Sequence, residues 1–412
     1  MPGNERETGE SPSMREKLLV IASFLLVFSF SAVDSAISPM VEPLQSFFSV
    51  PSPQVLWLIS TCTLGIAIGV FLGPTLTASF SNARLALISS VFLFFPLILF
   101  LLTKSFVFAL LFRFFFGLGA GVIASVMWWI TYYGVTEKYY PAMVTVLMAS
   151  RPMAIALGVP LAGILAEKTS WQTPFGFFAG LILISALCLV PSIKKEEKKK
   201  SFSLRKLFED YSGAFRVPYT RLYYLGLTIN RCCYFGFYSL AGIWFARHYG
   251  LSTGSIGTLL LVVGLGEALV NFLVPLLLKR FGHEKVFGFG LLASFFFLLL
   301  FIGGRFPLPL TVLFLTFFVI LDRVYGMAMI LMVPRMFPSS ENKTIFGSLT
   351  TLAAWLGLAA ISFFEGKTLE RLGLPGMEAV LLLCFVVGSI LLAFVQFKTV
   401  WGTPSPAIDG SV

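Results

Sequence analysis

Seven ionisable residues lie inside long apolar stretches of this 412-residue sequence, where charged side chains are rare. A charge at the centre of a lipid bilayer costs at least about 2.5–3.5 kcal/mol, so it normally faces a partner charge or a water-filled cavity. These residues are therefore the first candidates for chemistry. They are Asp34, Arg113, Arg151, Arg231, Glu267, Asp322 and Arg323.

Asp34 and Arg113 are predicted to lie at similar depths. Asp34 is about 17 residues, or roughly 25 Å of helix, from the start of its stretch, and Arg113 is about 7 residues, or roughly 10 Å, from the opposite end of its own. In a membrane about 30–40 Å thick the two side chains can meet. Two interpretations stay open: a buried acid beside an arginine, as proton coupling requires, or a fixed ion pair that joins two helices.

Arg151 and Arg231 each lie about ten residues into their stretches, close to mid-depth, where transporter cavities are found. Two arginines there favour an anionic ligand such as a carboxylate or phosphate. The alternative is that Asp34, Glu267 or Asp322 neutralises them. Polar residues near Arg231 that can line a cavity or join helices are Asn230, Tyr234 and Tyr238.

Twelve apolar stretches of about 20 residues, the length a helix needs to cross a bilayer, must position these side chains. The sequence is 57% apolar and only 12% charged, which indicates lipid rather than water as its solvent. None of the stretches alternates like a barrel strand, so the expected fold is an all-α membrane protein. The stretches are 18–41, 55–77, 86–103, 106–133, 141–165, 175–193, 219–246, 255–278, 286–304, 307–333, 345–364 and 377–399.

Positive charge is distributed unevenly over the predicted loops. Twenty of the 30 Lys and Arg lie on the side of both termini and the central loop, six lie on the other side, and four lie within the stretches. Since cytoplasmic loops carry the excess of positive charge, both termini are predicted to be cytoplasmic. This orientation, with contact to anionic lipid, explains the net charge of +10 without nucleic acid.

The sequence repeats itself at an offset of 201 residues. Over residues 64–81 and 265–282, eight of eighteen positions are identical, including Pro74 with Pro275 and Phe80 with Phe281. An offset of six crossings gives both copies the same orientation, and such parallel repeats are typical of secondary transporters. We therefore expect two six-helix bundles related by a pseudo-two-fold axis.

Four stretches resemble the major facilitator superfamily, in particular its twelve-helix drug/proton antiporters and sugar exporters. The stretches are Val33–Pro39, Gly73–Arg84, Arg113–Gly121, and Leu157–Gly163 with Trp171–Phe175. The resemblance implies that Asp34 is a proton site with Arg113 as its partner. The residues that it associates with conformational change are Gly73, Pro74, Arg84, Gly117, Gly121, Gly158, Pro160, Gly163, Arg280 and Gly282.

The loop after the second stretch departs from the superfamily pattern. Ala78 stands where an aspartate is expected, Lys279 takes that position in the second copy, and Gln172 replaces a trailing arginine. The charge relay that this loop normally forms is therefore expected to be altered.

No motif for ATP, metal or cofactor is evident. Gly366-Lys367-Thr368 lacks the glycine of a phosphate-binding loop, because Ile361 stands there. The five cysteines form no CxxC pair. Uphill transport must therefore use an ion gradient.

The preferred hypothesis is a secondary active transporter of the cytoplasmic membrane, a monomer that exports a small molecule in exchange for protons. Alternatives are an importer or uniporter of organic anions, and a non-transporting receptor or enzyme on the same scaffold. The cavity residues of this hypothesis are Arg151, Asn230, Arg231, Tyr238, Glu267, Asp322 and Arg323. Its segments are a tail (1–17), a first bundle (18–193), a central cytoplasmic loop (194–218), a second bundle (219–399) and a tail (400–412).

Overall fold

The computed structural model describes residues 14–136, 138–193, 203–303, 306–336 and 343–401, and these residues contain helices and no β-strand. Most of the two predicted tails, and residues 194–202 of the predicted central loop, lie outside the described residues.

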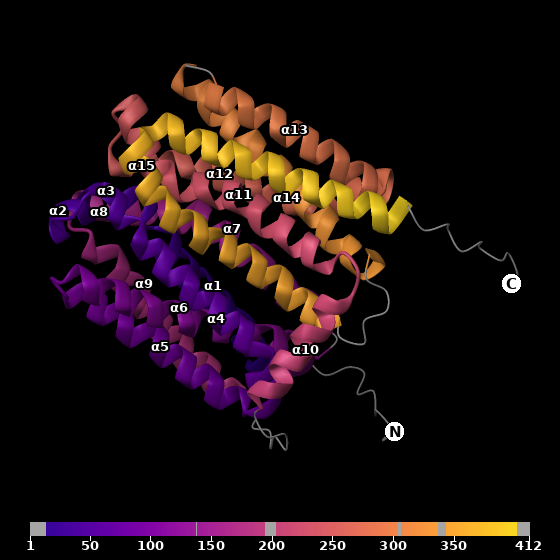
Figure 1. Cartoon of the computed structure of the whole chain (residues 1–412). Helices are drawn as coiled ribbons and strands as arrows, with labels where there is room; N and C mark the ends of the chain where they lie inside the picture. Colours follow the sequence, from indigo (N-terminus) through magenta and orange to yellow (C-terminus); the bar gives the residue numbers. More distant parts are fainter. Residues whose placement is uncertain (1–13, 137, 194–202, 304–305, 337–342, 402–412) are drawn as a thin grey trace, which may run out of the picture.

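Two helical bundles lie side by side (Figure 1). The elements of the first are α1 (Met14–Ser35), η1 (Ser38–Met40), α2 (Val41–Phe48), α3 (Ser52–Val55), α4 (Trp57–Ser79), α5 (Asn82–Leu102), α6 (Phe106–Trp129), η2 (Ile130–Gly134), α7 (Tyr140–Met153), η3 (Ala154–Gly158), α8 (Val159–Lys168) and α9 (Gln172–Ser192). Those of the second are α11 (Thr220–Tyr249), α12 (Thr253–Phe281), α13 (His283–Gly303), α14 (Leu308–Met336), α15 (Lys343–Gln396) and η4 (Phe397–Trp401), and α10 (Leu204–Arg216) joins the bundles.

The crossings agree with the predicted number. Among the described residues, ten helical segments are long and apolar enough to span a membrane. One of them, 349–399, contains the non-helical residue Gly373 and so consists of two arms. The 30-residue α11 is not among the ten, because Asn230, Arg231 and other polar residues lower its hydropathy. With both arms and α11 counted, twelve crossings result.

In each bundle, the chain enters the first helix and leaves the last helix on the same side of the molecule. Arg15 Nε, at the start of α1, donates to the carbonyl of Ser192 at the end of α9 over 2.7 Å. Likewise the ring of Tyr219, just before α11, lies 6.5 Å from that of Phe394 near the end of α15. We call this side, which carries α10, the α10 end, and the opposite side, which carries α2 and α3, the α2 end (Figure 1).

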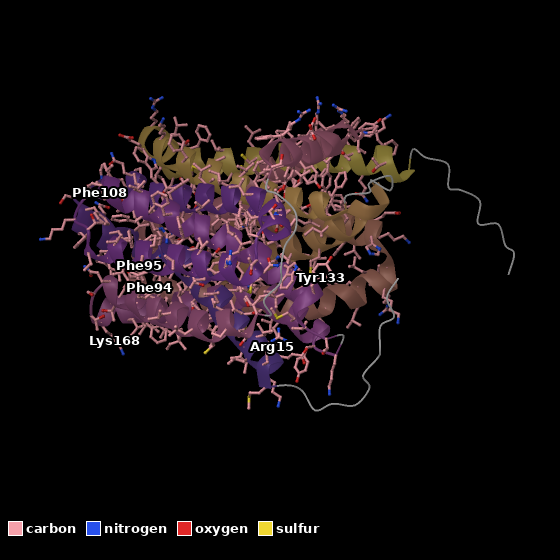
Figure 2. All side chains as sticks on the ribbon, turned by 90° about the horizontal axis from the view of Figure 1, so that it is seen from below. Arg15, Phe94, Phe95, Phe108, Tyr133 and Lys168 are labelled. Carbon is pink, nitrogen blue, oxygen red and sulfur yellow. The ribbon has the colours of Figure 1, made fainter. Side chains whose placement is uncertain are left out.

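Apolar side chains cover the outer surface of the bundles. Phe95 and Phe108 are more than half exposed and lie on the outside of the first bundle (Figure 2). Phe289 is 71% exposed on the second bundle. A soluble domain buries such residues, so this surface fits the hydrocarbon core of a bilayer.

Part of the predicted central loop is the helix α10. Leu207, Tyr211 and Ala214 recur at helical spacing and are buried. The rings of Tyr211 and Phe71 of α4 lie 4.5 Å apart, and Phe215 contacts Tyr224 of α11. This apolar stripe is short, so α10 lies across the ends of both bundles instead of crossing the membrane.

Candidate functional site

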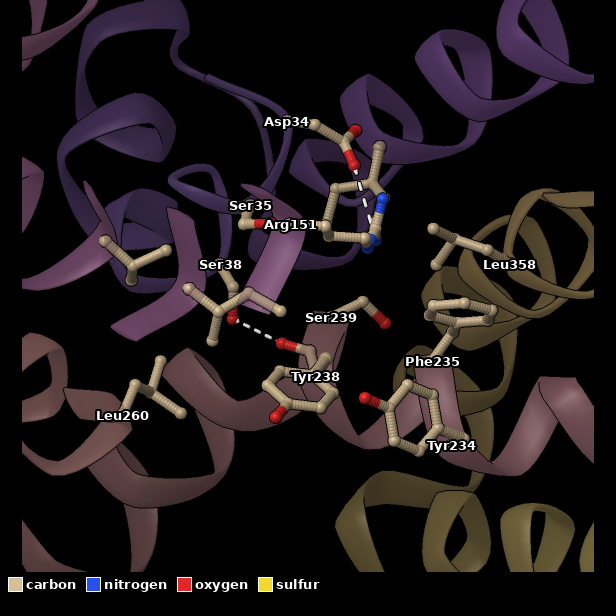
Figure 3. A pocket seen from close by; sticks show the side chains of 13 residues that line it. Asp34, Ser35, Ser38, Arg151, Tyr234, Phe235, Tyr238, Ser239, Leu260 and Leu358 are labelled. Atoms are coloured by element: carbon tan, nitrogen blue, oxygen red, sulfur yellow. Dashed lines mark hydrogen bonds and ion pairs between the residues drawn. The ribbon is translucent and has the colours of Figure 1, made fainter. Parts of the chain in front are cut away.

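A pocket lies where the two bundles meet, about midway along α11 (Figure 3). It encloses about 490 Å³ between atoms, part of it open to solvent. Four of the residues predicted from sequence line it directly: Asp34, Arg151, Tyr234 and Tyr238. Other lining residues are Ser35, Ser38, Phe235, Ser239 and Leu358.

Irregular backbone positions these groups. Helix α1 ends one residue after Asp34, and Pro39 in η1 prevents a regular continuation. Arg151 precedes Pro152, and the π-turn η3 follows at Ala154–Gly158. Such turns interrupt regular hydrogen bonding and are frequent at functional sites.

Asp34 lies between two arginines, as the depth argument predicted for one of them. Its Oδ1 is 3.7 Å from Arg113 Nη2, and its Oδ2 is 3.7 Å from Arg151 Nη2. Arg113 is 1% exposed and also donates from Nε to the carbonyl of Leu58 over 3.2 Å. Both ion pairs are longer than hydrogen bonds, and Oδ1 of Asp34 has no hydrogen-bond partner.

Arg151 is the member of this group that faces the pocket. Its guanidinium carbon lies 4.4 Å from the ring centre of Trp355 and 5.4 Å from that of Phe235, both in the second bundle. The side chain is 24% exposed, and Nη1 has no hydrogen-bond partner. Arg151 thus lines the pocket and has a buried N–H group without a hydrogen-bond partner.

Arg231 is instead fully engaged. It binds both carboxylate oxygens of Asp322, at 2.7 and 2.9 Å, and donates to Asn230 Oδ1 and to the Tyr325 hydroxyl. Tyr325 donates in turn to Asn230 Oδ1 over 2.9 Å. Asp322 is 2% exposed. For Arg231 the structure therefore shows neutralisation by a nearby acid, which the sequence analysis gave as the alternative to binding an anionic ligand.

Arg323 is paired as well. It binds Glu267, which is completely buried and also accepts from the Tyr238 hydroxyl over 3.1 Å. Tyr238 lines the pocket, so it links this second ion pair to the cavity. The described residues contain no group of three or more His, Cys, Asp or Glu that is arranged to hold a metal ion.

Arg231→Gln is expected to destabilise the protein by about 3–5 kcal/mol, because Asp322 then keeps a buried charge without a counter-charge. Thermal unfolding of the purified protein in detergent measures this loss. The double variant Arg231→Gln/Asp322→Asn is expected to recover part of it.

Arg205→Gln is the matched control, since Arg205 pairs with Glu209 on the exposed face of α10 and its loss is expected to change stability little. Equal unfolding temperatures for Arg231→Gln and Arg205→Gln would contradict a structural role for the Arg231 pair.

Three polar residues near the site were not predicted. Glu365 is completely buried, but it follows the predicted stretch 345–364 by one residue, so hydropathy places it in a loop. Ser239 and Tyr325 carry no charge and are common in apolar helices, so composition gave no signal for them. Only the contacts of Ser239 with Glu365 and of Tyr325 with Asp322 identify them.

The glycines singled out from sequence lie where helices approach closely. A Cβ on Gly121 of α6 would lie 2.8 Å from the Cα of Gly69 of α4, so these two helices pack closely. Gly117 of α6 packs in the same way against the backbone of Cys62, while Gly73 lies next to the side chain of Ser125.

The fifth-crossing motif contacts other helices. Gly158 lies against Ala32 of α1, Gly163 against Thr253 of α12, and a Cβ on Gly257 would lie 3.1 Å from the Cα of Pro160. The last two contacts join the bundles near the α2 end.

The loop motifs lie at the other end. Pro74 lies within the last turns of α4, Arg84 is exposed, and Gly282, at φ +80°, separates α12 from α13. Arg280 stacks on Phe281. No ion pair between described residues includes Arg84 or Arg280.

Residues 19–360 match the family model of the Major Facilitator Superfamily. The chain is 25% identical over 306 residues to YceJ of Bacillus subtilis (strain 168), an uncharacterised MFS-type transporter, covering 72% of this chain and 76% of that protein. Its fold is similar to that of a D-xylose–proton symporter (TM-score 0.72, 15% identity, 92% and 96% of the chains covered). It is also similar to a bacterial homologue of the human lysosomal transporter Spinster in an inward-facing conformation (TM-score 0.71, 15% identity, 97% and 100% covered). With a family match over most of its length, two helical bundles and a pocket between them, the chain belongs to the major facilitator superfamily.

Proposed function

We propose that the chain is a proton-coupled secondary transporter of the cytoplasmic membrane whose substrate is a small organic anion. Its superfamily supports the movement of a small molecule by alternating access. One observation carries the finer proposal: Asp34 is shared by two arginines, and one of them, Arg151, lines the pocket and has a buried donor without a hydrogen-bond partner.

Protonation of Asp34 is the proposed coupling step. A proton on Asp34 removes the charge that Arg113 and Arg151 share, which leaves Arg151 free to bind a carboxylate or phosphate. Loss of the proton restores the attraction between Asp34 and Arg151, and the anion is displaced. Because proton and anion bind in the same state, this arrangement favours cotransport.

The charge balance of the membrane interior supports an anion. The seven buried residues predicted from sequence comprise four arginines and three acids, so their formal sum is +1. Arg231 and Arg323 are neutralised by Asp322 and Glu267. The excess positive charge therefore lies with Asp34 and its two arginines.

Proton-driven export is the second candidate, and the fifth-crossing motif favours it. Gly158, Pro160 and Gly163 resemble the antiporter motif and lie in close helix contacts around the pocket. In this candidate the proton and the substrate occupy the pocket in turn instead of together.

The distribution of basic loops supports an orientation with the α10 end in the cytoplasm. The closest contacts between the bundles, such as Gly242 with Ser38 and Gly366 with Pro53, lie toward the α2 end. With that orientation the structure corresponds to a state closed to the outside. We expect a monomer, since the pocket is built from one chain.

Arg151→Gln is expected to weaken the binding of anionic ligands about 10- to 150-fold, which is the value of one charged hydrogen-bonded contact of about 1.5–3 kcal/mol. The measurement is thermal stabilisation of the purified protein by a panel of carboxylates, phosphate esters, neutral sugars and organic cations, since ligands stabilise the state that binds them.

Arg247→Gln is the matched control, because Arg247 lines a separate pocket at the α2 end. Anions should stabilise the wild type and the control but not Arg151→Gln. A panel in which organic cations stabilise the wild type best would refute an anionic substrate.

A further inference from the structure

Glu365 is a buried acid that the proposed mechanism does not use. Its side chain is completely buried in the first arm of α15, and the neighbouring Gly366 packs against Pro53 of α3. No ion pair between described residues includes Glu365, and its Oε1 has no hydrogen-bond partner. A carboxylate in such a place is costly, whereas a neutral carboxylic acid is tolerated.

Ser239 is the hydrogen-bond partner of Glu365. Its Oγ lies within hydrogen-bond distance of two acceptors, the carbonyl of Gly236 at 3.0 Å and Oε2 of Glu365. A hydroxyl group has one proton and can donate it to only one acceptor. A protonated Glu365 can donate to Ser239 while Ser239 donates to Gly236, so this arrangement accommodates the neutral acid.

No cation among the described residues lies within ion-pair distance of Glu365. Gly236 of α11 packs against Oε1, and a Cβ there would lie 2.9 Å from that oxygen. The titratable groups on packed elements are thiols, Cys232 of α11 and Cys384 of the second arm of α15. Along α15, Lys367 stacks on the ring of Phe363, Glu370 is exposed, and Glu378 accepts a hydrogen bond from Trp244.

Ser239 also connects Glu365 to the pocket. It lies in the pocket wall between Tyr238 and Phe235, opposite Asp34 and Arg151 (Figure 3). A proton on Glu365 thus has a route to the pocket through one hydroxyl group.

We propose that Glu365 is a second proton-binding residue, which takes up a proton from the pocket through Ser239 and releases it during the transport cycle. In this structure it carries the proton, so the buried charges sum to +1 and the pocket favours an anion. Release of the proton would bring the sum to zero and favour release of the anion. This inference rests on the proposed proton coupling and adds a second proton to it.

Infrared spectroscopy tests the protonation of Glu365 without transport. The purified protein at neutral pH is expected to show the carbonyl stretching band of a protonated carboxyl group. This band should be absent in Glu365→Gln and should change its frequency in Ser239→Ala. Glu370→Gln is the matched control, because Glu370 is an exposed glutamate on the same helix. If Glu365→Gln does not fold, the shift in Ser239→Ala decides; a spectrum unchanged in every folded variant would overturn the proposal.

Transport stoichiometry tests the release of the proton. With the membrane potential held at zero, each cotransported proton allows about tenfold accumulation per pH unit. Wild-type vesicles are expected to approach about hundredfold accumulation, Glu365→Gln about tenfold, and Glu370→Gln the wild-type value. Equal accumulation in wild type and Glu365→Gln would refute the second proton, whereas a wild type without any gradient-driven uptake would refute the proposed function itself.

Discussion

Asp34→Asn is expected to remove one of the two proposed coupling protons, and so to lower accumulation driven by a pH gradient about tenfold, while leaving exchange of substrate across the membrane intact. Asparagine is similar in size to a protonated aspartate and cannot lose a proton, so Arg113 and Arg151 are permanently without their shared counter-charge. Vesicles with a gradient of one pH unit should accumulate substrate about tenfold, the ratio that the remaining proton on Glu365 supports, where the wild type approaches about hundredfold.

The matched control for Asp34→Asn is Asn82→Asp, which makes the opposite replacement, of an amide by an acid. This variant adds a buried acid at the α10 end, away from the pocket. We expect Asn82→Asp to change the stability of the protein, whereas the folded variant should keep the wild-type number of protons per substrate. Undiminished gradient-driven uptake by Asp34→Asn would show that the coupling proton binds elsewhere. Reversing the gradient also separates the two candidates, because cotransport follows the protons and export runs against them.

Gly242→Ala is expected to prevent full closure of the α2 end. A Cβ on this residue of α11 would collide with the carbonyl oxygen of Ser38, and this oxygen belongs to the backbone of η1 and cannot rotate away. The Ser38 hydroxyl also donates to the carbonyl of Tyr238 over 2.7 Å, which holds the two bundles together here. Overpacking of about 1–3 kcal/mol would shift the equilibrium between closed and open states about 5- to 150-fold.

Labelling of a single introduced cysteine measures this shift. Ala246 lines the pocket at the α2 end, so Ala246→Cys in a cysteine-free background reports access from that side. A membrane-impermeant maleimide should react faster when Gly242→Ala is added. Gly180→Ala is the matched control, because a Cβ on Gly180 of α9 meets no atom within 4 Å. Equal labelling rates in both variants would exclude Gly242 from closure.

Much of the fold follows from local properties of the sequence. Apolar length predicts each crossing, because a helix must satisfy its own backbone hydrogen bonds in lipid. Composition likewise predicts the break between the last two crossings. In the structure this break is confined to Gly373, and the backbone is helical on both sides of this residue. The predicted central loop was only partly correct, since the apolar stripe of α10 is too short to register as a membrane stretch.

The candidate site was predictable as a set of residues but not as a set of partners. Depth along the helices brought Asp34 together with Arg113, and that prediction depends only on the rise per residue. Depth does not tell which way a side chain points around its helix. It therefore left open whether Arg151 or Arg231 faces the pocket, and it gave them equal weight.

The sequence by itself determined that the chain crosses a membrane about twelve times as two similar halves with charged residues inside. Hydropathy and the internal repeat contain that information, because both are properties of short segments. The tertiary structure alone decided how the charges are shared. Arg231 is neutralised by Asp322, 91 residues away, whereas Arg151 shares Asp34 with Arg113 and keeps a free donor. The physical reason is that the rotation and packing of helices distant in sequence fix which side chains meet, and no local pattern records that rotation.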